Sequence, residues 1–285
     1  MNEDMRRLLL SVFAILCVPA AAIAQQRPLV TEDPETVGAG RVLIEGGFDY
    51  GRNVEYSASG LKGNLLRFPL IGISVGVSSI AEIQIDGGLY NHLSITDRDF
   101  NAPLAGMVTA TGDGTSSVED VVIGTKIRLV PEGLYSPSWG FRFATRLPNA
   151  SNESGLGLDT TDFYASALGA KTINRVRVVG NLGVGILGDP TRGDRQNDVL
   201  TYGVSFARAL SPRAEAVGEV NGHVDTRQGR PLPGTESRSV LRIGARYTLG
   251  GWRADGALLV GLTDSDAGIG VAAGFTYVFK AFNVP

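Results

Sequence analysis

The clearest indication of the fold is the stretch Trp139-Gly-Phe-Arg-Phe-Ala-Thr-Arg-Leu147. Apolar side chains and one threonine stand at every second position, and glycine, alanine and arginine stand between them. Successive side chains of a β-strand point to opposite faces, so this alternation predicts a strand with one apolar face and one arginine-bearing face. A tilted strand of about 9 to 11 residues crosses a lipid bilayer, and this stretch has that length.

The same period of two recurs along the chain from Arg41 to Phe279. It is clearest in Ala81–Tyr90, Val118–Val130 and Ser237–Leu249, where apolar residues alternate with charged residues and glycines. Taken together, the alternation predicts about twelve strands. Their expected starts lie near residues 41, 64, 80, 118, 138, 160, 175, 198, 213, 237, 252 and 268.

The connections between these strands alternate in length. Short ones follow the even-numbered strands, at Val77–Ile80, Pro131–Pro137, Thr172–Arg175, Leu210–Arg213 and Leu249–Trp252. Longer ones, rich in Gly, Asp, Asn and Pro, follow the odd-numbered strands, at Arg52–Gly63, Asn91–Ser117, Asn149–Asp159, Gly188–Asn197 and Asp225–Glu236, and only the last, Thr263–Ala267, is brief. This rhythm is typical of an up-and-down barrel with both termini in the periplasm.

A soluble sandwich or lipocalin-like barrel is the alternative fold, and it would bury the apolar face and expose the arginines. Two features favour a membrane barrel instead. Glycine and arginine share one face, and aromatic residues stand near strand ends, as in interfacial girdles, at Trp139, Trp252, Tyr202, Tyr247, Tyr277 and Phe279. We therefore expect an all-β fold, a transmembrane up-and-down antiparallel β-barrel of about twelve strands.

The N-terminus carries the layout of a cleaved secretory signal. Arg6 and Arg7 precede the apolar run Leu8–Pro19, and Ala22-Ile23-Ala24 predicts cleavage before Gln25. The expected organisation is a signal peptide at residues 1–24, an extended periplasmic lead-in at 25–40, a barrel at 41–279 and a tail at 280–285. The lead-in has a second interpretation, as a partial plug inside the lumen. The expected location is the outer membrane of a Gram-negative bacterium.

The composition of the chain argues against two classes of partner, nucleic acids and transition metals. The formal net charge of −3 argues against nucleic acid as a partner. The chain has two histidines, which are far apart, and one cysteine, Cys17, which lies within the expected signal peptide. A transition-metal site is therefore not expected, and we expect no cofactor.

The final strand, Ile269–Phe279, places Phe275, Tyr277 and Phe279 on one face. This pattern resembles the C-terminal signal that the outer-membrane barrel assembly machinery reads, although the tail Lys280–Pro285 follows it. The expected partners are therefore membrane lipids, the assembly machinery and a small-molecule solute.

The chain after residue 25 resembles the outer-membrane family named for the meta-pathway of phenol degradation. The matching stretches are Arg27–Pro34, Val75–Ile83, Glu119–Lys126, Arg146–Pro148 and the final strand. The resemblance implies a barrel that passes small molecules, aromatic compounds among them. It supplies no catalytic residues.

The face opposite the apolar one is expected to line the lumen, and its charges are sorted by strand. The acidic candidates are Glu45, Asp49, Glu82, Asp86, Glu215 and Glu219, and the basic candidates are Lys126, Arg128, Arg142, Arg146, Arg175, Arg177, Arg238, Arg242 and Arg246. One interpretation is a charged constriction that selects solutes. In the other, the same charges pair across the barrel and fill it, because twelve strands lie between filled barrels of about 8 and channels of 16 or more.

An enzymatic alternative rests on His92 and Ser94, whose spacing is that of outer-membrane phospholipase A and lipid A deacylases. Two residues apart on a strand, both side chains share a face, and the imidazole could activate the hydroxyl. Ile95 stands where those enzymes have asparagine, and the bland interpretation is a polar strand end. The expected function is a channel for passive uptake of small molecules. The alternatives are this lipid hydrolase and a structural barrel with a filled lumen.

Overall fold

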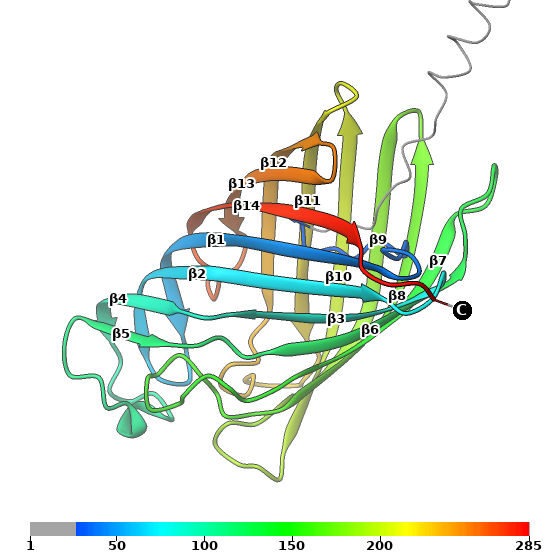
Figure 1. Ribbon diagram of the computed structural model, residues 1–285. Coiled ribbons are helices and arrows are strands. Elements are labelled where there is room, and N and C mark those ends of the chain that lie inside the picture. The colour runs from blue at the N-terminus through cyan, green and yellow to red at the C-terminus, as the bar shows by residue number, and fades with distance from the viewer. Residues whose placement is uncertain (1–26, 285) are drawn as a thin grey trace, which may run out of the picture.

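A computed structural model of the chain describes residues 27–284, so the expected signal peptide, residues 1–24, lies outside the described residues. The described chain is β-structure and loops apart from one short helical turn, η1 (Ala105–Met107). All of its strands belong to one antiparallel sheet (Figure 1). In chain order they are β1 (Arg41–Tyr56), β2 (Leu61–Gly76), β3 (Ala81–Gly88), β4 (Asn91–Arg98), β5 (Gly114–Ser117), β6 (Val122–Val130), β7 (Ser138–Arg146), β8 (Asp162–Ile173), β9 (Val176–Gly188), β10 (Gln196–Ala209), β11 (Ala214–Asp225), β12 (Arg238–Leu249), β13 (Trp252–Gly261) and β14 (Ile269–Lys280).

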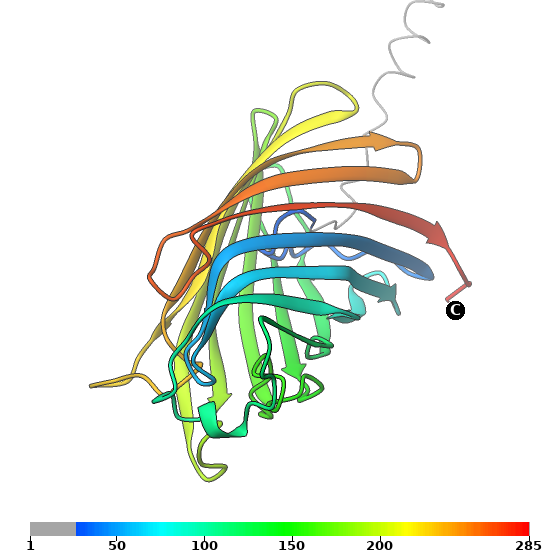
Figure 2. The ribbon, with the colours of Figure 1, turned by 90° about the vertical axis from the view of Figure 1, so that its left-hand side faces the viewer.

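The sheet closes on itself. β1 pairs with β14 along one edge and with β2 along the other, from Arg41 opposite Lys280 to Tyr56 opposite Leu61. From β6 to β14 each strand pairs with the next one in the sequence around the ring, which Figure 2 shows from the side. A closed ring leaves no strand edge without hydrogen-bond partners, and that is the condition for strands to stand in lipid.

Two barrel strands are interrupted, so the fourteen described segments make twelve crossings of the wall. β3 and β4 both pair with β2, one after the other, and they are two halves of one strand broken at Leu89 and Tyr90. β6 pairs with β3 and β5 pairs with β4, so β5 and β6 are likewise halves of one strand. The expected count of twelve is therefore confirmed.

The interruption has a local cause at Pro69 of β2. Proline has no backbone N–H and cannot donate to a ladder. Opposite it, the Leu89 N–H donates to the Pro69 carbonyl at 3.1 Å, and the Phe68 N–H donates to the Tyr90 carbonyl at 2.8 Å. These bonds keep the wall closed while the regular register breaks.

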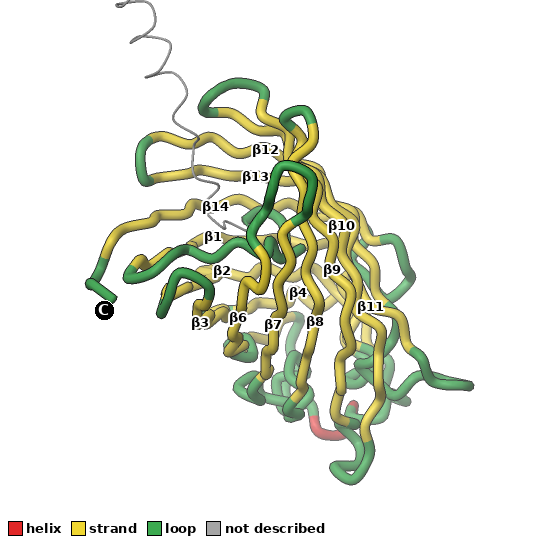
Figure 3. The backbone as a smooth tube through the Cα atoms, turned by 90° about the vertical axis from the view of Figure 1, so that its right-hand side faces the viewer, coloured by secondary structure: helices red, strands yellow, loops and turns green. Residues whose placement is uncertain are grey.

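Two expected loops are shorter than the sequence indicated. Residues expected in the loop Arg52–Gly63 belong to β1 and β2, which leaves only 57–60 as the connection. The expected loop Asn91–Ser117 begins and ends with paired strands, so the true loop is 99–113 and carries η1 (Figure 3). The ends of these strands are polar, as loops are, and for that reason the sequence pattern assigned them to the loops.

The barrel has two distinct ends. The turn end carries the short connections, and the loop end carries the longer ones (Figure 3). At the turn end the Gly40 carbonyl accepts hydrogen bonds from the N–H groups of Ala281 at 2.9 Å and Phe282 at 3.1 Å, which ties the start of β1 to the end of β14. Both ends of the barrel sequence therefore lie together, as an even number of crossings requires.

The apolar faces of the strands point outward. Ile243 is 60% exposed and Leu249 is 58% exposed, although both are large and apolar. Near the turn end the rings of Trp252 and Tyr277 stack with their centroids 4.4 Å apart. Within residues 27–284 no helix is long and apolar enough to cross a membrane. The exposed apolar band and its aromatic border are those of a transmembrane barrel. Recognition of Phe275, Tyr277 and Phe279 by the assembly machinery stays a prediction.

A charge placed on the outward face tests this orientation. Ile243→Arg is expected to reduce the free energy of unfolding by about 2–4 kcal/mol, because the guanidinium would stand in the bilayer midplane. Leu249→Arg, on the same face of β12 but at the turn end, is expected to cost no more than about 1 kcal/mol. Urea unfolding in lipid vesicles measures both, and equal costs for the two variants would contradict the assigned membrane position.

Candidate functional site

The interior of the barrel is occupied by residues 27–40, here called the inner segment. Its backbone is held by side chains of the wall. The Thr31 N–H donates to Glu219 at 2.8 Å, and the Val37 N–H donates to Glu82 at 2.6 Å. In Figures 1 and 2 the dark blue trace before β1 runs within the ring of strands. The part of the lead-in that the structure describes therefore enters the lumen from the turn end instead of lying outside the barrel.

Three acidic residues of the inner segment meet basic residues of one side of the wall. Glu32 lies 3.2 Å from Lys126 Nζ of β6 and 3.0 Å from Arg142 Nε of β7. Asp33 binds Arg177 of β9, with 2.7 Å between Oδ2 and Nε, and Glu35 binds Arg128 of β6. The basic charges of β6, β7 and β9 thus neutralise a segment that precedes the barrel in the sequence.

The opposite end of the inner segment meets the other wall. The guanidinium of Arg27 donates to the Ala273 carbonyl at 2.9 Å and lies 3.5 Å from Asp255. The Arg27 carbonyl in turn accepts from Arg246 at 2.8 Å. The inner segment therefore spans the lumen, from β6 and β7 on one side to β13 and β14 on the other.

Lys126 is the most enclosed cation of this set. Its side chain is 1% exposed, as is that of Glu82, whose carboxylate lies 3.0 Å from Nζ. A buried charge costs several kcal/mol unless it is paired and hydrogen-bonded, and removing one partner of such a pair costs on the order of 3–5 kcal/mol. Glu32, on the inner segment, completes the pairing of Lys126. Burial raises the pKa of Glu32, but the charges of Lys126 and Arg142 outweigh it and hold the pKa below the ordinary 4.5.

The remaining candidates can now be placed. Glu45 accepts from Thr276 at 3.2 Å, and Glu215 lies 3.8 Å from Arg246. Asp86 lies 3.9 Å from Arg142. The predicted residues whose side chains the structure places inside the barrel are Glu45, Asp49, Glu82, Asp86, Lys126, Arg128, Arg142, Arg146, Arg177, Glu215, Glu219, Arg238, Arg242 and Arg246.

Arg175 is a correction. It was expected among the lumen residues, but its side chain is exposed in the turn between β8 and β9. Ile173 pairs with Val176, so only Asn174 and Arg175 form the loop, and both have positive φ, 48° and 69°. The common two-residue hairpin turn requires that conformation at both positions. The expected strand start at residue 175 therefore lies one residue before the observed start of β9 at Val176.

Sequence reasoning missed Arg67 of β2. Its guanidinium binds Asp49 of β1, with 2.7 Å between Nε and Oδ1, and Glu119 at 2.8 Å. Glu119 lies in the break between β5 and β6, where apolar and polar residues do not alternate and the sequence does not show which side chains face the lumen. The proximity of Pro69 likewise obscured β2. The signal that could have found Arg67 is its charge between the apolar pairs Leu65–Leu66 and Phe68–Pro69 of β2.

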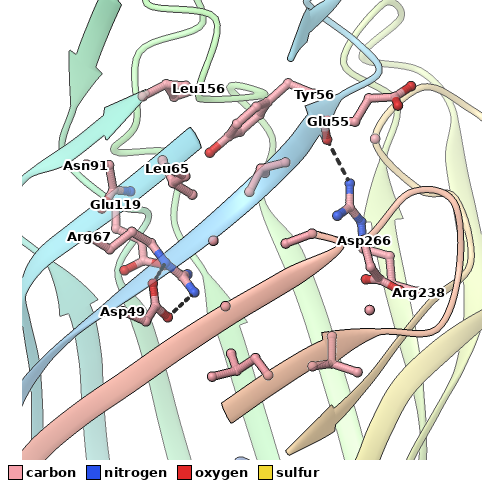
Figure 4. A pocket seen from close by; sticks show the side chains of 18 of the residues that line it. Asp49, Glu55, Tyr56, Leu65, Arg67, Asn91, Glu119, Leu156, Arg238 and Asp266 are labelled. Atoms are coloured by element: carbon pink, nitrogen blue, oxygen red, sulfur yellow. Dashed lines mark hydrogen bonds and ion pairs between the residues drawn. The ribbon is translucent and has the colours of Figure 1, made fainter. Parts of the chain in front are cut away.

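Above the inner segment two cavities follow one another. The outer cavity, about 530 Å³, lies at the loop end and is shown in Figure 4. The inner cavity, about 500 Å³, has Arg27, Val30 and Glu32 of the inner segment in its lining. The two cavities share lining residues, namely Asp49, Arg67, Glu119, Asp120, Val122, Arg146, Arg242 and Leu259. They therefore meet at the level of Arg67, and the inner segment lies below them.

The histidine pair expected for catalysis is arranged differently. His92 Nδ1 lies 2.8 Å from Ser116 Oγ of β5 and 3.4 Å from the Tyr90 hydroxyl. Ser94 is exposed, and within the described residues it makes no hydrogen bond to His92. The lumen cavities do not include either residue in their lining. The side-chain pair that forms is His92 with Ser116, outside the lumen.

No protein-family model matches the sequence, and no curated protein matches it. Solved structures do match in fold. An outer membrane channel from Pseudomonas putida F1 superposes with a TM-score of 0.61 at 13% identity, over 87% of this chain and 98% of that chain. The translocator domain of the autotransporter NalP from Neisseria meningitidis superposes with a TM-score of 0.50 at 14% identity, over 97% of this chain and 96% of that chain. The chain therefore has the fold of an outer-membrane β-barrel.

Proposed function

We propose that this protein is an outer-membrane channel for passive uptake of small molecules, and that the inner segment holds it closed. The observation that carries the proposal is the arrangement of the lumen, in which two adjoining cavities lie above a segment that is held by ion pairs and hydrogen bonds. The resemblance to the family named for phenol degradation supports aromatic compounds as solutes. The likeness in fold to a channel from Pseudomonas putida F1 supports the same class of function.

The way in which the inner segment is held suits reversible opening. The large buried apolar residues of the inner segment are Pro28, Leu29, Pro34 and Val37, and the other contacts described above are ion pairs and hydrogen bonds. Water can replace such contacts in an open lumen, whereas a wide apolar core would resist displacement. If the segment left, the lumen would keep the acidic and basic residues that now bind it, and they would line the passage.

A disulfide between the inner segment and the wall tests the closed state. An ideal Cβ at Gly203 of β10 would lie 3.4 Å from the Thr31 Cβ, close to the separation that a disulfide needs. We expect the double variant Thr31→Cys, Gly203→Cys to show no current in planar bilayers when oxidised. Reduction should restore the wild-type openings, because no other cysteine lies in the described chain.

The matched control is each single cysteine variant, which cannot form the intramolecular bond. A variant lacking residues 25–40 should conduct continuously. No current above background from the reduced double variant, the wild type and the truncated chain would support the structural barrel with a filled lumen instead.

Acid is expected to loosen the inner segment through Glu32. Because its pKa lies below 4.5 in the folded protein, its ion pairs are complete above pH 4.5 and are lost as the pH falls through the lowered pKa. The groups facing it are Lys126, Arg142 and Gln84. Open probability, measured by single-channel recording, should therefore rise only below about pH 4.5.

Glu32→Gln should give the acid behaviour at neutral pH, because it removes the same charge. Gln196→Glu, at the exposed start of β10, changes a charge outside these contacts and should leave the record unchanged. An oxidised Thr31→Cys, Gly203→Cys protein that opened in acid would show that acid acts on something other than the inner segment.

The hydrolase alternative now rests on His92 and Ser116, whose nitrogen and hydroxyl oxygen are 2.8 Å apart on the outer surface. A hydrolase would need the serine to attack a lipid ester with the imidazole as base. We expect no ester hydrolysis above background from the refolded wild type on phospholipid or lipid A micelles. Hydrolysis that Ser116→Ala abolishes and Ser94→Ala leaves intact would establish the enzyme and contradict this expectation.

A further inference from the structure

The outer cavity has an apolar wall inside a lumen that is otherwise charged. Leu61, Leu65 and Leu93 form a buried cluster where β1, β2 and β4 meet the loops. Packed on this cluster are further apolar residues, and those that also line the cavity are Val54, Tyr56 and Leu156. Together with Leu65 they are called the apolar wall. Such a surface facing a water-filled cavity favours a bound hydrocarbon group over water.

Most cations of the outer cavity are already neutralised by carboxylates of the protein. Arg67 is bound by Asp49 and Glu119. Arg146 is bound by Asp162, and Arg242 is bound by Glu219 at 2.8 Å. These three guanidinium groups are therefore occupied in the closed state.

Arg238, the first residue of β12, is different. Its contact is a single hydrogen bond from Nη2 to the Glu55 carbonyl at 3.3 Å, and within residues 27–284 no carboxylate lies within ion-pair distance of it. The neighbouring Asp266 is engaged elsewhere, since it accepts from the Ser239 N–H at 2.8 Å and the Thr263 hydroxyl at 2.7 Å. Among the described residues the Arg238 guanidinium therefore lines the cavity without an ion-paired carboxylate.

Figure 4 shows the relation of these two features. The Arg238 side chain extends toward the cavity from one side, and Tyr56, Leu65 and Leu156 lie on the other side. Between them is a space of about 530 Å³, which is within the range of small-molecule sites. A guanidinium pairs with a carboxylate through two parallel hydrogen bonds, and an apolar surface takes up a ring or chain.

We propose that the outer cavity binds small apolar carboxylates, with Arg238 holding the carboxylate and the apolar wall receiving an aromatic ring. The proposal rests on the proposed channel function and names the class of solute that it admits.

Binding to the detergent-refolded mature chain tests the proposal, with benzoate as the probe. Isothermal titration or saturation-transfer NMR measures the affinity, and benzamide, a neutral molecule of the same shape, is the matched probe. Arg238→Gln should weaken benzoate binding about tenfold or more and leave benzamide unchanged, because only the charge-assisted pair is lost. Leu156→Ser should weaken both probes, because it places a hydroxyl in the apolar wall.

Arg192→Gln is the control, since Arg192 is an exposed loop residue that does not line the cavity. All variants are first checked for the heat-dependent gel mobility of a folded barrel. Benzoate affinity that Arg238→Gln does not change would overturn the proposal, and so would wild-type protein that binds neither probe.

The measurement is made on the oxidised Thr31→Cys, Gly203→Cys protein as well, so that binding is read while the inner segment is fixed. Unchanged benzoate affinity in this closed protein is the expected result, since the outer cavity lies above the inner segment. If the protein binds benzoate but the reduced protein passes no current, the channel function is contradicted and the carboxylate site is supported. If the reduced protein passes current but Arg238→Gln does not change the benzoate affinity, the channel function is supported and the carboxylate site is contradicted.

Discussion

The structure depends on one constraint, which is that backbone N–H and C=O groups cannot be left unpaired in lipid. Here the constraint is met by pairing β1 with both β2 and β14, so that the sheet has no edge. Closure also fixes the size of the interior. With twelve crossings the lumen is too wide for wall side chains alone to fill and narrow enough for one extended segment to cross it.

The same constraint explains why the wall tolerates the break around Pro69. A proline in the middle of an open sheet would leave a carbonyl of the neighbouring strand without its donor. In this wall the neighbouring strand breaks at the matching position, and Leu89 and Tyr90 shift so that their backbone groups still meet Phe68 and Pro69. An irregular patch with its hydrogen bonds made is compatible with lipid, whereas an unpaired one is not.

Charge inside the barrel follows from a second balance, between desolvation and pairing. The basic residues of β6, β7 and β9 would repel one another in an empty, narrow lumen, and the acids of the inner segment offset that repulsion. At the loop end the lumen holds the outer cavity, and there Arg67, Arg146 and Arg242 are paired with carboxylates of the wall. Arg238 differs from this pattern, because its guanidinium donates to a backbone carbonyl and forms no ion pair with a carboxylate of residues 27–284.

The alternation in the sequence predicted twelve barrel strands and their faces, because a period of two is a local property that does not depend on which strands pair, but it did not predict the segments β4 and β5. Trp139–Leu147 carries its apolar and polar faces within nine residues, and β7 matches it from Ser138 to Arg146. Fourteen of the fifteen predicted lumen candidates face inward, since facing inward follows from the same alternation, but the prediction missed the inward charges Arg67, Glu119, Asp162, Arg253 and Asp255. Arg175 failed because the position of a two-residue turn depends on how β8 and β9 pair.

Tertiary structure alone decided which charges meet. Glu32 and Lys126 are 94 residues apart, and their contact depends on the path of the inner segment through a closed ring. The strand β4, whose residues the sequence pattern placed in a loop, is likewise defined by its pairing with β2 and β5. Local alternation places a side chain on a face, but the stagger and closure of the barrel determine what lies across from it. That is why the alternation predicted which side chains face the lumen, whereas the place of the lead-in inside the lumen was only one of two interpretations of the sequence.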